Sequence, residues 1–403
     1  MNFTDRLKNT DFILCRFNFA AFLRALLLLN PIMLLFYTEN GLTVKELFLF
    51  QSIFYLVSIL IELPVGYFSD FISKKYSLLT SYLFFISTML LWIFFSGYWI
   101  ILTGEILLAI SKVIMDNTHS GYLYDYLDSK DKKSAMPASY GYLNFALAAG
   151  TTLAAIIGTY LYSTFGSKSN LYSEVVISIV CIVLILSLPN VYTPHKRENK
   201  LKKLLKVTKA ICNNNSIMYY IYYSGFLTSL SVMFALSFQP ALLKAACPIA
   251  LFGVAAFCNH GIRAVFSALT SKINKHIRIR SMIIPLFVLY LIAFGCIFIM
   301  LHCKNPVIMM SMILIVCLII GFQLMFTIRQ VSRLHNFVSS ESRGTIVSVN
   351  NLFSRFITFL VLFTSKFCID KLGFEQYVLI IFIIFIPVGI ILMNKTYKIE
   401  EKI

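Results

Sequence analysis

The chain has 403 residues, of which 59% are hydrophobic and only 13% are charged, and its mean hydropathy is +0.80. Soluble domains carry about 25% charged residues, so this composition excludes a soluble globular protein. The long apolar runs also exclude a transmembrane β-barrel, because barrel strands show short segments of alternating hydrophobicity.

The apolar residues form twelve stretches, each long enough to cross a membrane as a helix, which requires about 20 residues. The sequence therefore predicts an all-α polytopic membrane protein with twelve transmembrane helices. The predicted spans are 12–37, 44–69, 76–95, 98–127, 134–165, 171–190, 214–242, 247–270, 281–301, 306–332, 343–369 and 374–394.

The net charge of +17 is distributed unevenly along the chain. Most Lys and Arg residues fall in connections that lie on one side of the membrane if the N-terminus is cytoplasmic. The lysines on the other side are Lys45, Lys168, Lys244, Lys304 and Lys371. This is the positive-inside pattern, and it predicts that both termini are cytoplasmic. The basic charge thus indicates topology, and no nucleic acid partner is expected.

The first apolar stretch is too long for a cleavable signal and contains Arg16 and Arg24, so it is predicted to remain as helix 1. The nine cysteines are scattered and include no CxxC pair. We therefore expect no metal site, no disulfide and no cofactor.

Four stretches, every third one, lack strongly polar residues in their interiors: 76–95, 171–190, 281–301 and 377–394. Glu174 is the one acid among them and stands at the edge of its stretch. A fully apolar helix can face lipid on all sides, whereas a charged one must face protein or water. This period of three predicts three-helix units, each with one peripheral helix.

The only long polar segment separates two six-helix halves. We predict an N-terminal bundle at 1–192, a linker at 193–213 and a C-terminal bundle at 214–403. In the linker, Leu201, Leu204, Leu205 and Thr208 have helical spacing among lysines, which is typical of a basic amphipathic helix on the inner membrane surface. A duplicated six-helix plan, pseudo-symmetric and with the substrate path between the halves, is common among transporters.

A motif at the end of predicted helix 2 resembles the signature of the major facilitator superfamily. The matching residues are Gly66, Asp70, Lys74 and Lys75, whereas Phe71 and Ser73 depart from the family pattern. The resemblance implies a cytoplasmic gate, in which Asp70 accepts hydrogen bonds at the start of helix 11, where Arg343 is a charge partner. The predicted gate residues are Glu62, Gly66, Asp70, Lys74, Lys75, Asp125 and Arg343. Alternatively, the two lysines only set topology.

Two further segments carry the resemblance. Helix 5 contains Gly150 and Gly158 at positions of the superfamily's antiporter pattern, but Ala155 replaces its proline, and small residues at this spacing also serve helix packing. The end of helix 4, at 121–127, is similar to that of a poorly characterised bacterial subgroup. The resemblance implies an integral, multi-pass protein of the bacterial inner membrane.

Helix 4 carries the densest set of ionisable residues. Glu105, Lys112, Asp116 and His119 all fall on one helical face at 100° per residue. Such a face is costly in lipid, so it is expected to line protein or water. We predict that Glu105, Asp116 and His119 relay protons, since His titrates near neutrality; the alternative is a fixed ladder of salt bridges.

The other intramembrane charges are mainly positive. Arginine binds carboxylate or phosphate and stays charged, which predicts an anionic or zwitterionic substrate. The alternative is that Arg24 pairs with a helix 4 acid, which leaves the cavity near neutral. The predicted substrate-binding residues are Arg24, Lys112, His260, Arg263, Asn351 and Arg355.

Together these features predict a monomeric, proton-coupled secondary transporter of a small organic anion or zwitterion, such as a metabolite or a carboxylate chelator (siderophore). The lipid bilayer and protons are its other partners. A proton-coupled multidrug efflux antiporter is the alternative. A membrane enzyme or a non-transporting sensor is a remote one, since no HExxH, GxSxG or Walker A motif occurs.

Overall fold

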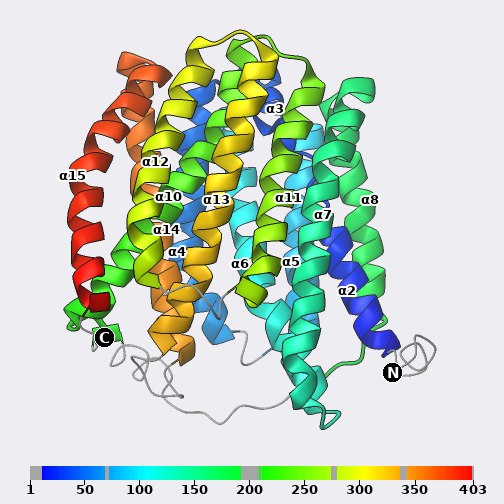
Figure 1. Cartoon of the computed structure of the whole chain (residues 1–403). Helices are drawn as coiled ribbons and strands as arrows, with labels where there is room; N and C mark the ends of the chain where they lie inside the picture. The colour runs from blue at the N-terminus through cyan, green and yellow to red at the C-terminus, as the bar shows by residue number, and fades with distance from the viewer. Residues whose placement is uncertain are drawn as a thin grey trace. The chain divides into compact units, whose positions relative to one another are not determined.

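The computed structural model describes residues 11–68, 72–191, 208–209, 211–273, 279–335 and 343–401. Within these ranges every regular element is a helix, and eleven helices are long and apolar enough to cross a membrane (Figure 1). The first predicted span, 12–37, is divided among shorter helices and is not one of these eleven. The predicted all-α polytopic fold is confirmed, while most of the predicted linker helix at 193–213 lies outside the described residues.

The chain divides into two compact units. The first contains residues 1–36 and 60–195, and the second contains residues 37–59 and 196–403. The segment 37–59, which the sequence analysis assigns to the N-terminal bundle, groups with the second unit. As a result α4 (Val44–Phe68) contributes its first part to the second unit and its last turns to the first.

The first unit is built mainly from α5 packed on α6 and α8, and from α2 packed on α7 and α8 (Figure 1). Its core joins Phe17, Tyr82, Tyr122 and Cys181 from four of these helices. Its elements are α2 (Phe12–Arg24), the 3₁₀ helix η1 (Asn30–Ile32), the start of α3 (Met33–Glu39), the end of α4, α5 (Lys74–Phe94), α6 (Tyr98–Asp128), the 3₁₀ helix η2 (Lys133–Ala135), α7 (Met136–Phe165) and α8 (Ser167–Leu186).

In the second unit, α10 packs against α14, and α13 lies beside both α11 and α12. An aromatic cluster on α10, α12 and α15 forms its core, where Phe385 contacts Phe226, Phe287, Tyr290 and Phe294. Its main helices are α10 (Asn215–Lys244), α11 (Ile249–Ile273), α12 (Ile279–His302), α13 (Pro306–Leu334), α14 (Arg343–Leu372) and α15 (Phe374–Glu401).

Each unit joins its last two helices through one glycine. Gly166 connects α7 to α8 with φ of 79°, and Gly373 connects α14 to α15 with φ of 93°. A positive φ is accessible to glycine without steric cost, so a single residue can reverse the chain between two spanning helices. The same one-glycine connection at equivalent places in the two halves agrees with the predicted duplication.

The first membrane segment, predicted as one helix over 12–37, is broken in the structure. α2 ends at Arg24, residues 25–29 form turns and irregular backbone, and the chain is helical again from Asn30. Backbone groups freed by such a break must find partners inside the membrane. The partners come from α8, and they are described with the site below.

The prediction of one peripheral helix in every three is not supported by burial. The most apolar windows of α5 and α12 are half buried, whereas that of α11, which carries several polar residues, is only 17% buried. Exposed surface on a membrane protein includes both lipid-facing and water-facing surface. Polarity along a helix therefore does not report how much of that helix other helices cover.

Candidate functional site

Arg24, at the last turn of α2, is buried in the first unit. Its guanidinium carbon lies 3.8 Å from the centre of the Phe85 ring, and its Nη2 donates a long hydrogen bond of 3.5 Å to Ser111 Oγ. Its Nε has no hydrogen-bond partner among the described residues. The predicted substrate-binding arginine is thus held mainly by an aromatic face, which favours a cation once water is excluded.

The four ionisable residues that were predicted to share one face of α6 differ in how far they are buried. Glu105 and His119 are buried, and the His119 ring stands edge-on to Phe17 with 5.7 Å between ring centroids. Lys112 and Asp116 instead have side chains that are 51% and 40% exposed, and they form an ion pair of 2.6 Å. One face of the helix therefore carries two buried groups and, between them, an open charge pair.

An exposed charge pair halfway along a spanning helix cannot face lipid without a cost of several kcal/mol. Lys112 lies about 21 Å from the start of α6 at 1.5 Å per residue, which is well inside the membrane. We therefore assign this side of α6 to water rather than to acyl chains.

In the second unit, Arg263 and Arg355 lie on α11 and α14 and act electrostatically on the same group, the Tyr55 hydroxyl of α4. His260, one turn from Arg263, lies within its electrostatic range. The structure thus brings together three of the predicted substrate-binding residues. Asn351, one turn before Arg355 on α14, is exposed.

Arg263 has an exposed side chain in the middle of α11. Among the residues that the structure describes, no carboxylate forms an ion pair with it, and the groups that act on it are Tyr55, Tyr290 and Cys317. An arginine in a spanning helix needs water or an anion when no acid is near. This side chain is available to a ligand.

The predicted gate falls only partly on described residues. Asp70 lies outside them, and the description of Gly66 and Arg343 extends only to their helical backbone. Lys75 donates to Leu186 O and Leu188 O, both at 2.7 Å, and so caps the carboxyl end of α8.

Three other predicted gate residues are described within the first unit. Lys74 is buried, and the aliphatic part of its side chain packs beside Gly121 of α6. Asp125 is buried on α6, and Glu62 is half-buried on α4. The gate itself remains a prediction.

The glycines of the helix 5 pattern pack against the break in helix 1. A Cβ at Gly150 would collide with the Phe22 carbonyl oxygen, and one at Gly158 would collide with that of Leu28. Small residues at this spacing let two backbones approach closely. Close packing of α7 on helix 1 therefore explains both glycines.

Two residues of α8 that hold this break are absent from the predicted site residues. Asn170 Nδ2 donates to Leu28 O at 2.7 Å and to Gly158 O at 2.8 Å, and Glu174 Oε1 accepts from the Leu29 N–H at 2.9 Å. α8 begins at Ser167, four residues before the predicted start, so Glu174 lies inside the helix. The available signal was an acid and an amide one turn apart in an otherwise apolar segment.

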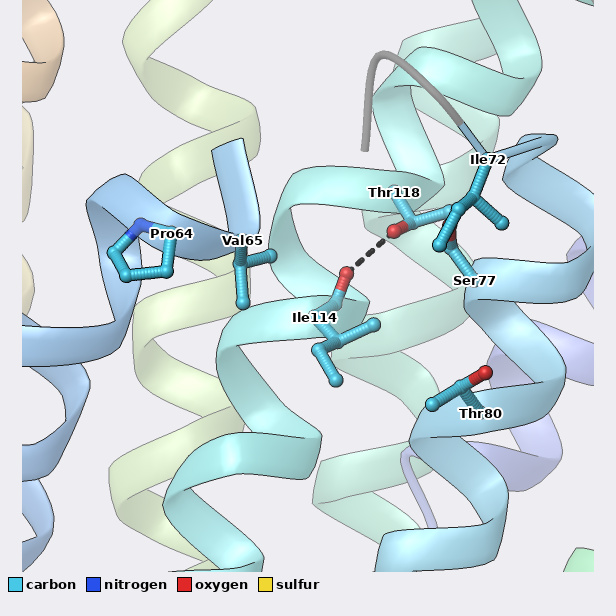
Figure 2. Close-up of a pocket in the computed structure, with 7 residues that line it drawn as sticks. All are labelled: Pro64, Val65, Ile72, Ser77, Thr80, Ile114 and Thr118. Atoms are coloured by element: carbon cyan, nitrogen blue, oxygen red, sulfur yellow. Dashed lines mark hydrogen bonds between the residues drawn. The ribbon is translucent and has the colours of Figure 1, made fainter. Parts of the chain in front are cut away.

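A cavity of about 200 Å³ lies in the first unit at the ends of α4 and α5, next to α6 (Figure 2). Its walls are apolar or carry hydroxyl groups, and the Thr118 hydroxyl that faces it donates to Ile114 O at 2.6 Å. None of the predicted substrate-binding residues lines it. The residues that line it are Pro64, Val65, Ile72, Ser77, Thr80, Ile114 and Thr118.

Solved structures of transporters share this fold. The nucleoside transporter NupG is 12% identical with a TM-score of 0.76 and covers 96% of this chain and 99% of its own. A D-xylose–proton symporter is 11% identical with a TM-score of 0.73, and 96% of each chain is covered. A bacterial homolog of the human lysosomal transporter Spinster is 12% identical with a TM-score of 0.67, over 97% of this chain and 96% of its own.

These identities are low, so the solved structures show the fold alone. No curated protein sequence matches the chain. The sequence model of the Major Facilitator Superfamily matches residues 14–362, which is most of the chain. This protein is a multi-pass membrane transporter, and it belongs to the major facilitator superfamily.

Proposed function

We propose that the protein is a secondary active transporter that moves a small organic anion or zwitterion across a bacterial inner membrane by proton-coupled alternating access. The observation that carries the proposal is the open side chain of Arg263 in a spanning helix, with no described acid beside it. Arg355 adds a second positive charge near the same Tyr55 hydroxyl. A carboxylate or phosphate group would bind the Arg263 guanidinium through paired hydrogen bonds, and the charge of Arg355 would add to the attraction.

The proton in this proposal binds to acids that face water or lie buried in the first unit. Asp116 is open and pairs with Lys112, so protonation of Asp116 would free the lysine charge. Glu105 and His119 lie deeper on the same helix face. The halves that move are the predicted bundles 1–192 and 214–403, and the working state is a monomer.

The test is a thermal-shift screen of the purified protein against organic acids, phosphates, siderophores and lipophilic drugs. We expect stabilisation by one class of anion or zwitterion, with loss of that stabilisation in Arg263→Ala and Arg355→Ala. Arg16→Ala is the matched control, because Arg16 is exposed near the start of α2 and stacks on Phe12.

Stabilisation by lipophilic cations alone would instead support the multidrug antiporter. An anion whose effect survives both arginine substitutions would contradict the proposed site. Uptake of a confirmed ligand into proteoliposomes, with and without an imposed pH gradient, then measures proton coupling directly.

A further inference from the structure

The break in helix 1 is held from α8 by a single ionisable group. Glu174 is only 2% exposed. Its carboxyl group accepts the N–H of Leu29 at 2.9 Å and also the N–H of Leu28. These two amides belong to the irregular segment 25–29, so no helical carbonyl is available to them. The carboxyl group thus accepts the hydrogen bonds that backbone carbonyl groups would accept in a continuous helix.

Other contacts fix the rest of the break independently of any proton. Asn170, one turn before Glu174, binds the carbonyl oxygens of Leu28 and Gly158. Gly158 lets α7 press directly on the Leu28 backbone. The carbonyl side of the break is therefore held by neutral groups, whereas the amide side depends on the charge state of Glu174.

The charged and titratable groups around Glu174 and Arg24 come from four helices. Arg24 of α2 is the charged group that acts on Glu174. Arg24 itself interacts electrostatically with Tyr82 of α5, Cys181 of α8 and, more weakly, Asp116 of α6. α7 contains no Asp, Glu, Lys, Arg or His along its length. Burial disfavours the ionised carboxylate, whereas Arg24 and the two amides favour it. These opposing effects together set the affinity of Glu174 for a proton.

We propose that Glu174 is a proton-binding site that controls the break in helix 1. In the ionised state the carboxylate holds the Leu28 and Leu29 amides through charge-assisted hydrogen bonds. When it takes a proton from water, the neutral acid holds them less tightly, and the backbone between Arg24 and Asn30 becomes free to rearrange. No other bond is made or broken in this step.

This site adds a carboxyl group to the proposed proton coupling, on a helix that the predicted relay on α6 does not include. Protonation of Glu174 also removes the negative charge near Arg24, so Arg24 gains attraction for any other anion. By linkage, an anion that binds near Arg24 would raise the affinity of Glu174 for the proton by the same factor. The use of the site in transport rests on the proposed function, but the proton switch itself does not.

Amide hydrogen exchange of the full-length protein in detergent tests the proposal without a substrate. We expect the exchange protection of Leu28 and Leu29, corrected for intrinsic exchange chemistry, to fall by roughly fivefold from alkaline to acidic pH, because charge-assisted hydrogen bonds are about twice as strong as neutral ones. Glu174→Gln should show the lower protection at every pH.

Glu105→Gln is the matched control, since Glu105 is an equally buried acid on α6, and it should keep the full pH dependence at the break. Protection that is constant with pH in the wild type, or pH dependence that survives in Glu174→Gln, would overturn the proposal.

Infrared spectroscopy provides a second readout. Acidification protonates many of the 18 acidic side chains, so the readout is the difference between the two proteins. The wild type should gain a protonated carboxyl band that Glu174→Gln lacks, and identical spectral changes in both would also overturn the proposal. If Glu174→Gln does not fold, Glu174→Asp replaces it, because the shorter side chain must shift the midpoint of the pH dependence, and an unshifted midpoint counts against the site. Failure of anion transport would leave these results untouched, so the two proposals fail separately.

Discussion

Lys45 Nζ, at the start of α4, lies 2.7 Å from Asp370 Oδ1, near the end of α14. One turn further along α4, Phe48 packs against Phe374 and Tyr377, with ring centroids 5.5 and 5.9 Å apart. The pair joins the predicted outer ends of helices 2 and 11, whose inner ends the sequence analysis assigns to the cytoplasmic gate. The ion pair and the two aromatic contacts together hold the first turns of α4 against α14 and α15 within the second unit.

Reversal of one charge in this pair should loosen the outer end of α4. We expect a cysteine placed at Ser52, which is fully buried on α4, to react severalfold faster with an impermeant thiol reagent in Lys45→Glu, measured in a background without other reactive cysteines. The double reversal Lys45→Glu/Asp370→Lys should restore slow labelling. Lys304→Glu, at an exposed lysine that does not act on Asp370, serves as the control. Equal acceleration by this substitution would show that the pair has no specific role.

Exposed surface that faces water can be separated from surface that faces lipid by cysteine labelling. Cysteines at Lys112 and Arg263 should react with a charged, hydrophilic reagent, because their native charges require water in the membrane. Cysteines at Val183 and Val265 should stay unreactive although these side chains are 61% and 56% exposed. Since Val265 lies on the opposite side of α11 from Arg263, equal reactivity of the two would contradict the assignment.

Gly158→Ala should destabilise the first unit. The added methyl group meets the Leu28 backbone, and overpacking of this kind costs about 1–3 kcal/mol. Gly141→Ala is the control on the same helix, because nothing lies within 4 Å of a Cβ at that position. Thermal unfolding in detergent, followed by tryptophan fluorescence, should show a lower midpoint for Gly158→Ala only.

Arg24 and Phe85 should be coupled energetically. A cation over an aromatic face contributes about 2 kcal/mol when water is excluded, and neighbouring residues show such coupling in double-mutant cycles. Arg24→Gln and Phe85→Leu together should therefore cost less than the sum of the two single substitutions. Strict additivity of the unfolding free energies would place the stabilisation of Arg24 elsewhere.

The spans of the fold follow from the sequence because length and hydropathy decide whether a helix can cross a membrane. Helical spacing likewise puts Glu105, Lys112, Asp116 and His119 on one face of α6. The spacing cannot say which part of that face a neighbouring helix covers. That depends on Phe17 and other side chains from α2, so the division into buried and open groups emerges only from packing.

The break in helix 1 was not predictable from its own residues. The segment Ala25-Leu26-Leu27-Leu28-Leu29 consists of strong helix formers, and only the following Asn30-Pro31 hints at a change of direction. The groups that stabilise the break, Asn170 and Glu174, stand more than 140 residues away along the chain. Tertiary contacts override local propensity at this point.

The distance in sequence between helix 1 and α8 also sets an order of events during synthesis. Helix 1 leaves the ribosome long before Asn170 and Glu174 exist, so its amides at Leu28 and Leu29 must first bond within a continuous helix or to lipid-interface water. The hydrogen bonds that hold the break in helix 1 can form only once the sixth span has entered the bilayer. The N-terminal bundle therefore reaches its final form only after the first segment exchanges its early hydrogen-bond partners for Asn170 and Glu174.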